Sequence, residues 1–122
     1  MKIKTRWDRS KYEIQKAYAY SIRNGMLVQY SGEFWHGYSG YTGRDYNAFV
    51  VANENNCEVK RIGCAATEGE VANRVVWLSE PNRAKAAMLL IAYEREQINE
   101  LEERIVKHEQ LIEMLTREME EV

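Results

Sequence analysis

The last third of the chain, from Asn82 to Val122, contains neither glycine nor proline and repeats its apolar residues every seven positions. The steps alternate between three and four residues, which is the spacing of the a and d positions of a coiled coil. The repeat comprises Ile98, Leu101, Ile105, His108, Ile112, Leu115, Met119 and Val122, preceded by Ala84, Ala87 and Ile91. It predicts one helix of roughly 60 Å at ~1.5 Å per residue, and such a helix needs a partner. We therefore expect a homo-oligomer.

The residue types along this repeat favour two strands. Isoleucine at a positions with leucine at d positions is typical of parallel dimers, in which Arg104 at a g position faces Glu109 at an e position of the partner. His108 and Glu94 occupy d positions, where polar residues usually fix the register. Because Arg104 lies one turn before His108, the alternative is that the two present donors to a phosphate between protomers.

The helix is expected to begin near residue 80. Ser79 or Glu80 followed by Pro81 suits a helix start, because the first turn has backbone N–H groups without intrahelical acceptors. The sequence therefore divides into a β-rich domain, 1–79, and an oligomerisation helix, 80–122. The stretch 86–93 is apolar nearly all round, which predicts that the N-terminal domain covers it together with a partner helix.

The N-terminal part is expected to form an antiparallel sheet of about five strands, which makes the fold class α+β. Alternating apolar residues predict strands at 2–7, 46–52, 57–65 and 71–78. The last two are expected to form a hairpin whose turn, 67–70, is built around Gly69.

The segment 10–23 has two interpretations. Ser10 and Glu13 form a capping box for a helix, whereas its tyrosines and isoleucines also alternate at period two. The following Asn24 and Gly25 favour a strand and a hairpin, because this dipeptide suits the positive φ angles of a type I′ turn, although it would also serve as a helix C-cap.

The segment 31–46 (SGEFWHGYSGYTGRDY) combines aromatic residues with a glycine at every third position from Gly37 to Gly43. Glycines let backbone N–H groups approach an anion, aromatic faces stack on a nucleobase, and arginine pairs bidentately with phosphate. We expect a loop that suits a nucleotide, with Trp35, Tyr38 and Arg44 as candidate ligand-binding residues. The alternative is a turn whose tyrosines cover the edge of the core.

Composition excludes several classes. With a formal charge of -2 and 45% apolar residues, the chain fits an ordinary soluble domain, and its acidic balance argues against coating nucleic acid. No apolar run is long enough to span a bilayer and no signal peptide is recognised, so a cytoplasmic location is expected. Cys57 and Cys64 are expected to be free thiols, and no metal or cofactor is predicted.

Catalysis has little support in the sequence. No Ser/His/Asp, Cys/His or paired-carboxylate set can be assigned to neighbouring elements, and His36 is the only candidate acid or base. A lone histidine in a loop is usually solvated. We therefore expect a non-enzymatic binding protein.

The β-rich domain, the Trp-Leu-x-Glu step at 77–80 and a helix that opens with Ala84, Ala87 and Ile91 resemble small anti-defence proteins of phages and their lysogens. Within that group the chain is most similar to the Thoeris anti-defence sponge family, compact β domains with long C-terminal helices. The resemblance implies an oligomer that captures a cyclic ADP-ribose isomer made by bacterial TIR-domain enzymes. It implies sequestration without hydrolysis, in a recessed site at the protomer interface.

Such a site would place aromatic residues on adenine and helix arginines on the pyrophosphate. Arg23, Trp77, Arg104 and His108 have the chemistry for it, although Trp77 also suits a core position and Arg104 a salt bridge with Glu109. The alternative function is a protein-binding inhibitor or adaptor, similar to an anti-CRISPR protein, whose acidic helix occupies a nucleic-acid groove. The glutamates of residues 94–121 supply the charge for it.

Overall fold

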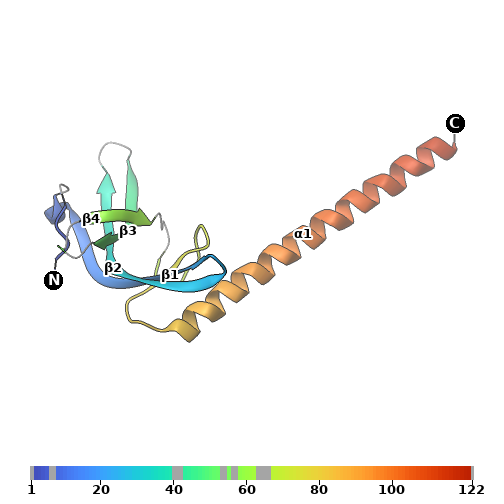
Figure 1. The fold of residues 1–122 in the computed structure, drawn as a ribbon. Helices are drawn as coiled ribbons and strands as arrows, with labels where there is room; N and C mark the ends of the chain where they lie inside the picture. The colour runs from blue at the N-terminus through green and yellow to red at the C-terminus, as the bar shows by residue number, and fades with distance from the viewer. Residues whose placement is uncertain are drawn as a thin grey trace. The chain divides into compact units, whose positions relative to one another are not determined.

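The computed structural model describes residues 2–5, 8–39, 43–52, 55, 58–62 and 67–121, without the side chains of 38, 39, 44–46 and 58–62. These residues form a short 3-10 helix, five strands and one long helix (Figure 1). The elements are η1 (Arg9–Lys11), β1 (Tyr12–Arg23), β2 (Met26–Ser39), β3 (Arg44–Ala52), β4 (Glu58–Ile62), β5 (Val76–Leu78) and α1 (Arg83–Glu120). The α+β layout confirms the predicted antiparallel sheet followed by a long C-terminal helix.

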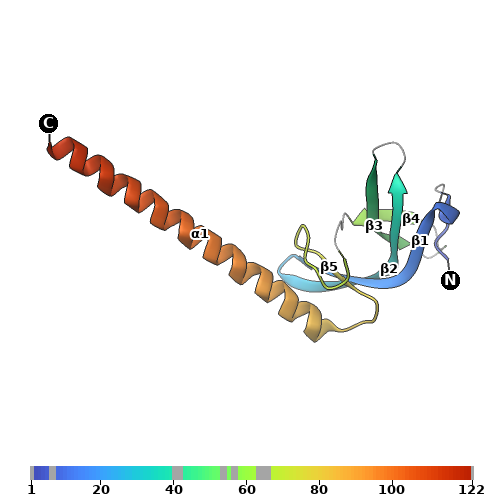
Figure 2. The ribbon, with the colours of Figure 1, turned by 180° about the vertical axis from the view of Figure 1, so that it is seen from behind.

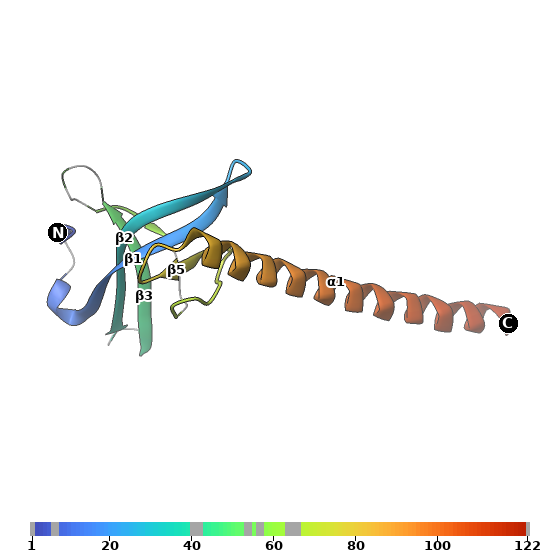
Figure 3. The same cartoon turned by 90° about the horizontal axis from the view of Figure 1, so that it is seen from below.

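In the described part of the chain the strands form one sheet in the order β4-β3-β2-β1-β5, and every pairing is antiparallel. Strands β1 to β4 follow one another as a meander, and the chain then crosses to the opposite edge, where β5 pairs with β1. Strands β1 and β2 lie side by side as a long, curved ribbon (Figures 2 and 3). Their twelve paired positions make this ribbon the largest structural unit of the sheet.

The β1–β2 hairpin settles the ambiguity of the segment 10–23 in favour of a strand. Asn24 and Gly25 have φ angles of 51° and 74°, as a type I′ turn requires, and Arg23 pairs with Met26 across the turn. The capping box does not form. Asp8 caps η1 instead, with its carboxylate accepting the Ser10 N–H at 3.0 Å.

The predicted loop at 31–46 is wrong, because β2 continues to Ser39 and β3 begins at Arg44. Adjacent aromatic residues are compatible with a strand here because both faces of β2 are buried at this point. Phe34 belongs to one core cluster and Trp35 to another. Gly32 allows the strands to come close, since a Cβ there would collide with the carbonyl oxygen of Val50 on β3.

The predicted strand at 2–7 is also wrong within its described residues, where Lys4 makes only a single bridge and Arg6 and Trp7 lie outside the description. Side chains bind the backbone there in place of a strand. Arg9 Nη1 donates to the Ile3 carbonyl at 2.7 Å, and the Glu33 carboxylate accepts the Ile3 N–H at 3.4 Å.

The predicted hairpin between 57–65 and 71–78 is wrong, because β4 and β5 lie on opposite edges of the sheet. The second segment is divided by a tight turn at Asn73 and Arg74, with φ angles of 52° and 59°, where Ala72 and Val75 exchange two backbone hydrogen bonds of 3.0 Å. The turn at 67–70 is confirmed: the Glu70 N–H donates to the Thr67 carbonyl at 3.1 Å.

Helix α1 begins later than Ser79 or Glu80, with Asn82 as its N-cap. The Asn82 side chain accepts the Lys85 N–H at 3.0 Å, and the Asn82 N–H donates to the Tyr20 hydroxyl at 2.9 Å. The helix start then packs on the sheet, because Ala86 joins the cluster of Tyr20, Val76 and Leu78. Leu89 and Leu90 are half-buried against the same cluster, whereas Met88 and Ile91 are exposed.

The chain separates into two compact units, Met1–Leu90 and Ile91–Val122. The first contains the sheet, its clusters and the beginning of α1. The second is the remainder of α1, which is exposed along its described length apart from Tyr93 and Gln97. Each unit is described separately below.

A bidentate ion pair fixes the N-terminal segment on the sheet. Arg9 donates to both carboxylate oxygens of Glu33, at 2.8 and 2.9 Å, and its guanidinium lies 5.2 Å from the Trp35 ring centroid. Burial opposes the ionisation of Glu33, but the hydrogen bonds and charge of Arg9, with smaller contributions from Trp35 and Ile3, lower the pKa of its carboxyl overall.

We expect Glu33→Gln to lower the free energy of unfolding at neutral pH by about 1.5–3 kcal/mol, because charge-assisted hydrogen bonds are lost. The lowered pKa of Glu33 stabilises the fold above about pH 5, and this stabilisation is lost as the pH falls through the folded-state pKa. Urea titrations from pH 3 to 7 should therefore show a difference between wild type and variant that shrinks toward acid. A difference that is constant with pH would contradict this assignment.

Candidate functional site

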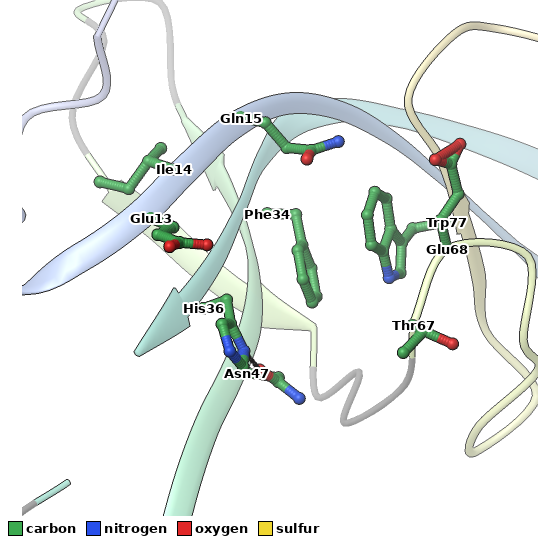
Figure 4. A pocket seen from close by; sticks show the side chains of 9 residues that line it. All are labelled: Glu13, Ile14, Gln15, Phe34, His36, Asn47, Thr67, Glu68 and Trp77. Atoms are coloured by element: carbon green, nitrogen blue, oxygen red, sulfur yellow. Dashed lines mark hydrogen bonds between the residues drawn. The ribbon is translucent and has the colours of Figure 1, made fainter. Parts of the chain in front are cut away.

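The main candidate site is a pocket of about 420 Å³ on the sheet face that carries Phe34 and Trp77 (Figure 4). Strands β1, β2, β3 and β5 supply most of its lining, and the turn at 67–70 supplies the rest. The described lining residues are Glu13, Ile14, Gln15, Phe34, His36, Asn47, Thr67, Glu68 and Trp77. The pocket lies entirely within the first unit.

A row of polar side chains crosses three strands at one end of the pocket. Glu13 on β1 pairs with His36 on β2, and His36 pairs with Asn47 on β3, so all three lie on the same face. The Asn47 side-chain oxygen forms a hydrogen bond with Nδ1 of His36 (Figure 4). Because an amide oxygen only accepts, this contact requires a hydrogen on Nδ1 of the ring.

Two stacked aromatic rings form the apolar wall. The rings of Phe34 and Trp77 lie with centroids 4.0 Å apart and planes 17° from parallel, and the two residues are only 7% and 4% exposed. Each ring therefore has one face engaged with the other, and little of either remains accessible. Trp77 is a core residue that also borders the pocket, so the contact it offers to a ligand is small.

The charged residues of the described lining are both acidic, Glu13 and Glu68. Glu68 accepts hydrogen bonds from the Ser79 N–H at 2.8 Å and from the Ser79 hydroxyl at 2.7 Å. These two bonds, with a smaller contribution from the charge of Lys85, lower the pKa of Glu68 and keep its carboxylate ionised at neutral pH. The described lining therefore suits hydrogen-bond donors better than it suits a phosphate group.

The structure separates the residues that the sequence nominated for a ligand site. Trp35 and Trp77 lie on opposite faces of the sheet, and the indole N–H of Trp35 donates to Glu33 at 3.4 Å. Arg23 is exposed at the end of β1, beside the hairpin turn. Tyr38 and Arg44 belong to β2 and β3, with side chains outside the description. Arg104 and His108 are exposed in the second unit, one turn apart.

Sequence reasoning singled out His36 but missed its partners. Glu13 and Asn47 are distant in sequence, and only the strand register places them beside the imidazole. Phe34 was part of an expected loop, so its stacking on Trp77 had no signal in the sequence. Once the type I′ turn is accepted, counting outward from Asn24 and Gly25 does identify Glu13 as the partner of His36.

Within the described residues, no group of three or more histidine, cysteine, aspartate or glutamate side chains is placed to hold a metal ion. Cys57 and Cys64, expected as free thiols, lie outside the description. No described helix is both long enough and apolar enough to cross a membrane.

Comparisons with protein-family models, with curated proteins and with solved structures find no match to this chain. The pocket and the exposed surface of α1 are the two features of the described chain that suggest a function. The pocket belongs to the first unit, and the exposed surface belongs mainly to the second.

We expect the His36 ring to carry a hydrogen on Nδ1, because Asn47 supplies an acceptor there. Long-range ¹H–¹⁵N spectra of ring-labelled protein report the tautomer directly. Asn47→Ala should shift the ring toward the Nε2–H form, whereas Gln29→Ala, a change outside the pocket, should leave it unaltered. A wild-type ring protonated on Nε2 would show that Asn47 donates through its nitrogen instead.

Proposed function

We propose that this protein is a non-enzymatic, homo-oligomeric binding protein that sequesters a small nucleotide signal, with its copies joined through α1. The observation on which the proposal depends most is the seven apolar residues of the heptad repeat that are 50–77% exposed in the described chain. They are Ile91, Ile98, Leu101, Ile105, Ile112, Leu115 and Met119. An apolar stripe of this length on a soluble protein marks an interaction surface.

The energy available from this stripe is sufficient for association. Burying the exposed half of an isoleucine or leucine side chain contributes about 1 kcal/mol, which gives on the order of 10–20 kcal/mol for the seven positions in two copies. Association costs about 4–15 kcal/mol in lost freedom. A long helix also gains most of its stability from packing, which favours a partner along the second unit.

The pocket supports a binding role over a catalytic one. The Thr67 hydroxyl, which is the candidate nucleophile of the described lining, donates to Glu70 at 3.0 Å. Among the described lining residues, none offers His36 a hydroxyl activated by hydrogen bonding to its ring. Side-chain amides of Gln15 and Asn47 instead present donors and acceptors of the kind that recognise a nucleobase edge.

The nucleotide class comes from the resemblance to the Thoeris anti-defence sponges, which implies a cyclic ADP-ribose isomer. Glu13 and Glu68 make the described pocket lining acidic, so the pocket is not proposed as a phosphate site. Arg104 and His108, on adjacent turns of α1, remain the proposed contacts at a protomer interface. The host cytoplasm is the proposed location.

A second candidate, a protein-binding inhibitor or adaptor, is favoured by the charge of the second unit. Residues 94–121 contain ten glutamates against four arginines and lysines, and the charged side chains of this segment are exposed. Such a surface suits a basic partner, and its binding should weaken steeply with salt. Nucleotides would then leave the stability of the protein unchanged.

We expect one cyclic ADP-ribose isomer, from a panel of linear and cyclic nucleotides, to raise the melting temperature by about 5 °C or more at saturation, because a ligand that binds only the folded state stabilises it. The ligand should be recovered intact after heat denaturation. Arg104→Ala should remove the shift, whereas Lys107→Ala, a matched loss of charge outside the heptad seam, should retain it. An unchanged melting temperature with every nucleotide of the panel would favour a protein partner.

We expect Leu101→Asp to convert the oligomer to monomer in sedimentation velocity. Loss of a packed leucine costs about 2–5 kcal/mol, and an unpaired carboxylate in the seam adds to that cost. Gln110→Asp introduces the same charge at an f position, on the opposite side of the helix, and should leave the oligomer intact. An oligomer unchanged by Leu101→Asp would rule out association through this seam.

A further inference from the structure

The exposed stripe of α1 carries charges on its two flanks, and these charges distinguish the ways in which a second copy can dock. Arg104 lies at a g position, and Glu102 and Glu109 lie at e positions, all exposed. We infer that the stripe binds a second copy of this chain as a parallel, in-register, two-stranded coiled coil. This inference rests on the self-association proposed above, and it tests the parallel orientation and the two chains that the repeat predicts against the antiparallel and trimeric alternatives.

In a parallel dimer, residues at g positions lie opposite residues at e positions of the next heptad in the partner. In the dimer without ligand, Arg104 of each copy then faces Glu109 of the other, and the two-fold symmetry repeats this attraction. In an antiparallel dimer with full overlap, e positions lie opposite e positions. Glu102 would then face Glu109 of the other copy twice, with like charges in contact. Charge complementarity therefore favours the parallel arrangement.

The polar seam position at His108 supports the same orientation. In register, His108 meets its own counterpart, and two neutral imidazoles can share a hydrogen bond because each ring has one donor and one acceptor. In the antiparallel overlap, His108 would face Ile105, which leaves its ring nitrogens without a partner in the seam. Glu94 meets its counterpart as well, which opposes association, but it is exposed and lies in the second layer of the second unit, close to the end of the stripe.

Two chains suit the seam better than three. Isoleucine occupies a at Ile98, Ile105 and Ile112, and leucine occupies d at Leu101 and Leu115, a combination that favours two strands. One feature favours a third copy: Leu111 is exposed at a g position, where it widens the apolar face on one side. The experiments below therefore measure the number of chains as well as their orientation.

The test uses charge reversal and needs no cross-linker. In a parallel dimer, Glu109→Arg places Arg104 against an arginine and should weaken self-association about three- to tenfold at low salt. The double variant Arg104→Glu/Glu109→Arg should restore the wild-type dissociation constant. In an antiparallel dimer, Glu109→Arg would instead tighten association, because it pairs with Glu102. Sedimentation equilibrium in 50 mM and 500 mM salt measures these differences.

A disulfide provides an independent measurement. In a Cys57→Ser/Cys64→Ser background, Leu101→Cys should cross-link to itself under mild oxidation, since equivalent d positions approach within disulfide range only in a parallel dimer. Gln110→Cys, at an f position, should remain reduced. Cross-linking between Ile98→Cys and Leu115→Cys chains, with Leu101→Cys reduced, would overturn the orientation but keep the self-association. A trimeric mass would overturn the number, and a monomer would overturn both this inference and the proposed oligomer.

Discussion

The type I′ turn at Asn24 and Gly25 is the constraint on which most of the first unit depends. It sets the register of β1 and β2, whose pairing extends from Arg23 and Met26 to Tyr12 and Gly37. Because side chains alternate along a strand, a slip of one residue would move Phe34 to the opposite face and separate His36 from Glu13. The aromatic stack and the polar row of the pocket are therefore consequences of two turn residues nine or more positions away.

The sheet is buried on both faces, and this explains why several local patterns were ambiguous. Phe34 and Trp35 are neighbours in sequence, yet each contributes to a separate core cluster. The face that carries Trp35 and Tyr20 is covered in two regions by different means. Arg9 and Glu33 hold the N-terminal segment on one region, and Ala86 of α1 packs on the other. A core of this kind combines a partly buried ion pair with apolar packing, so its stability is linked to pH as well as to burial.

The two units differ in the kind of binding surface that they present. The first is self-contained, with a pocket whose lining is amide, imidazole, carboxylate and aromatic. The second presents apolar side chains that the described chain itself does not bury. The proposed self-association would bury these side chains without requiring a second kind of protein, because a second copy of the chain presents the same apolar stripe. In the first unit, the described pocket lining offers a ligand hydrogen-bonding groups and acidic charge.

The sequence by itself determined the elements with strong periodicity or definite turn chemistry. These are the helix after Asn82, the third strand and the overall α+β class, because each follows from interactions between residues close in the chain. The β1–β2 hairpin was favoured by Asn24 and Gly25, but a helix over 10–23 stayed open. Only the tertiary structure decided that β5 pairs with β1 and not with β4, and that 31–39 is a strand. It also decided that Asn47 and Glu13 flank His36, and that Trp77 stacks on Phe34. These depend on contacts between residues distant in sequence, and local propensity carries no record of such contacts.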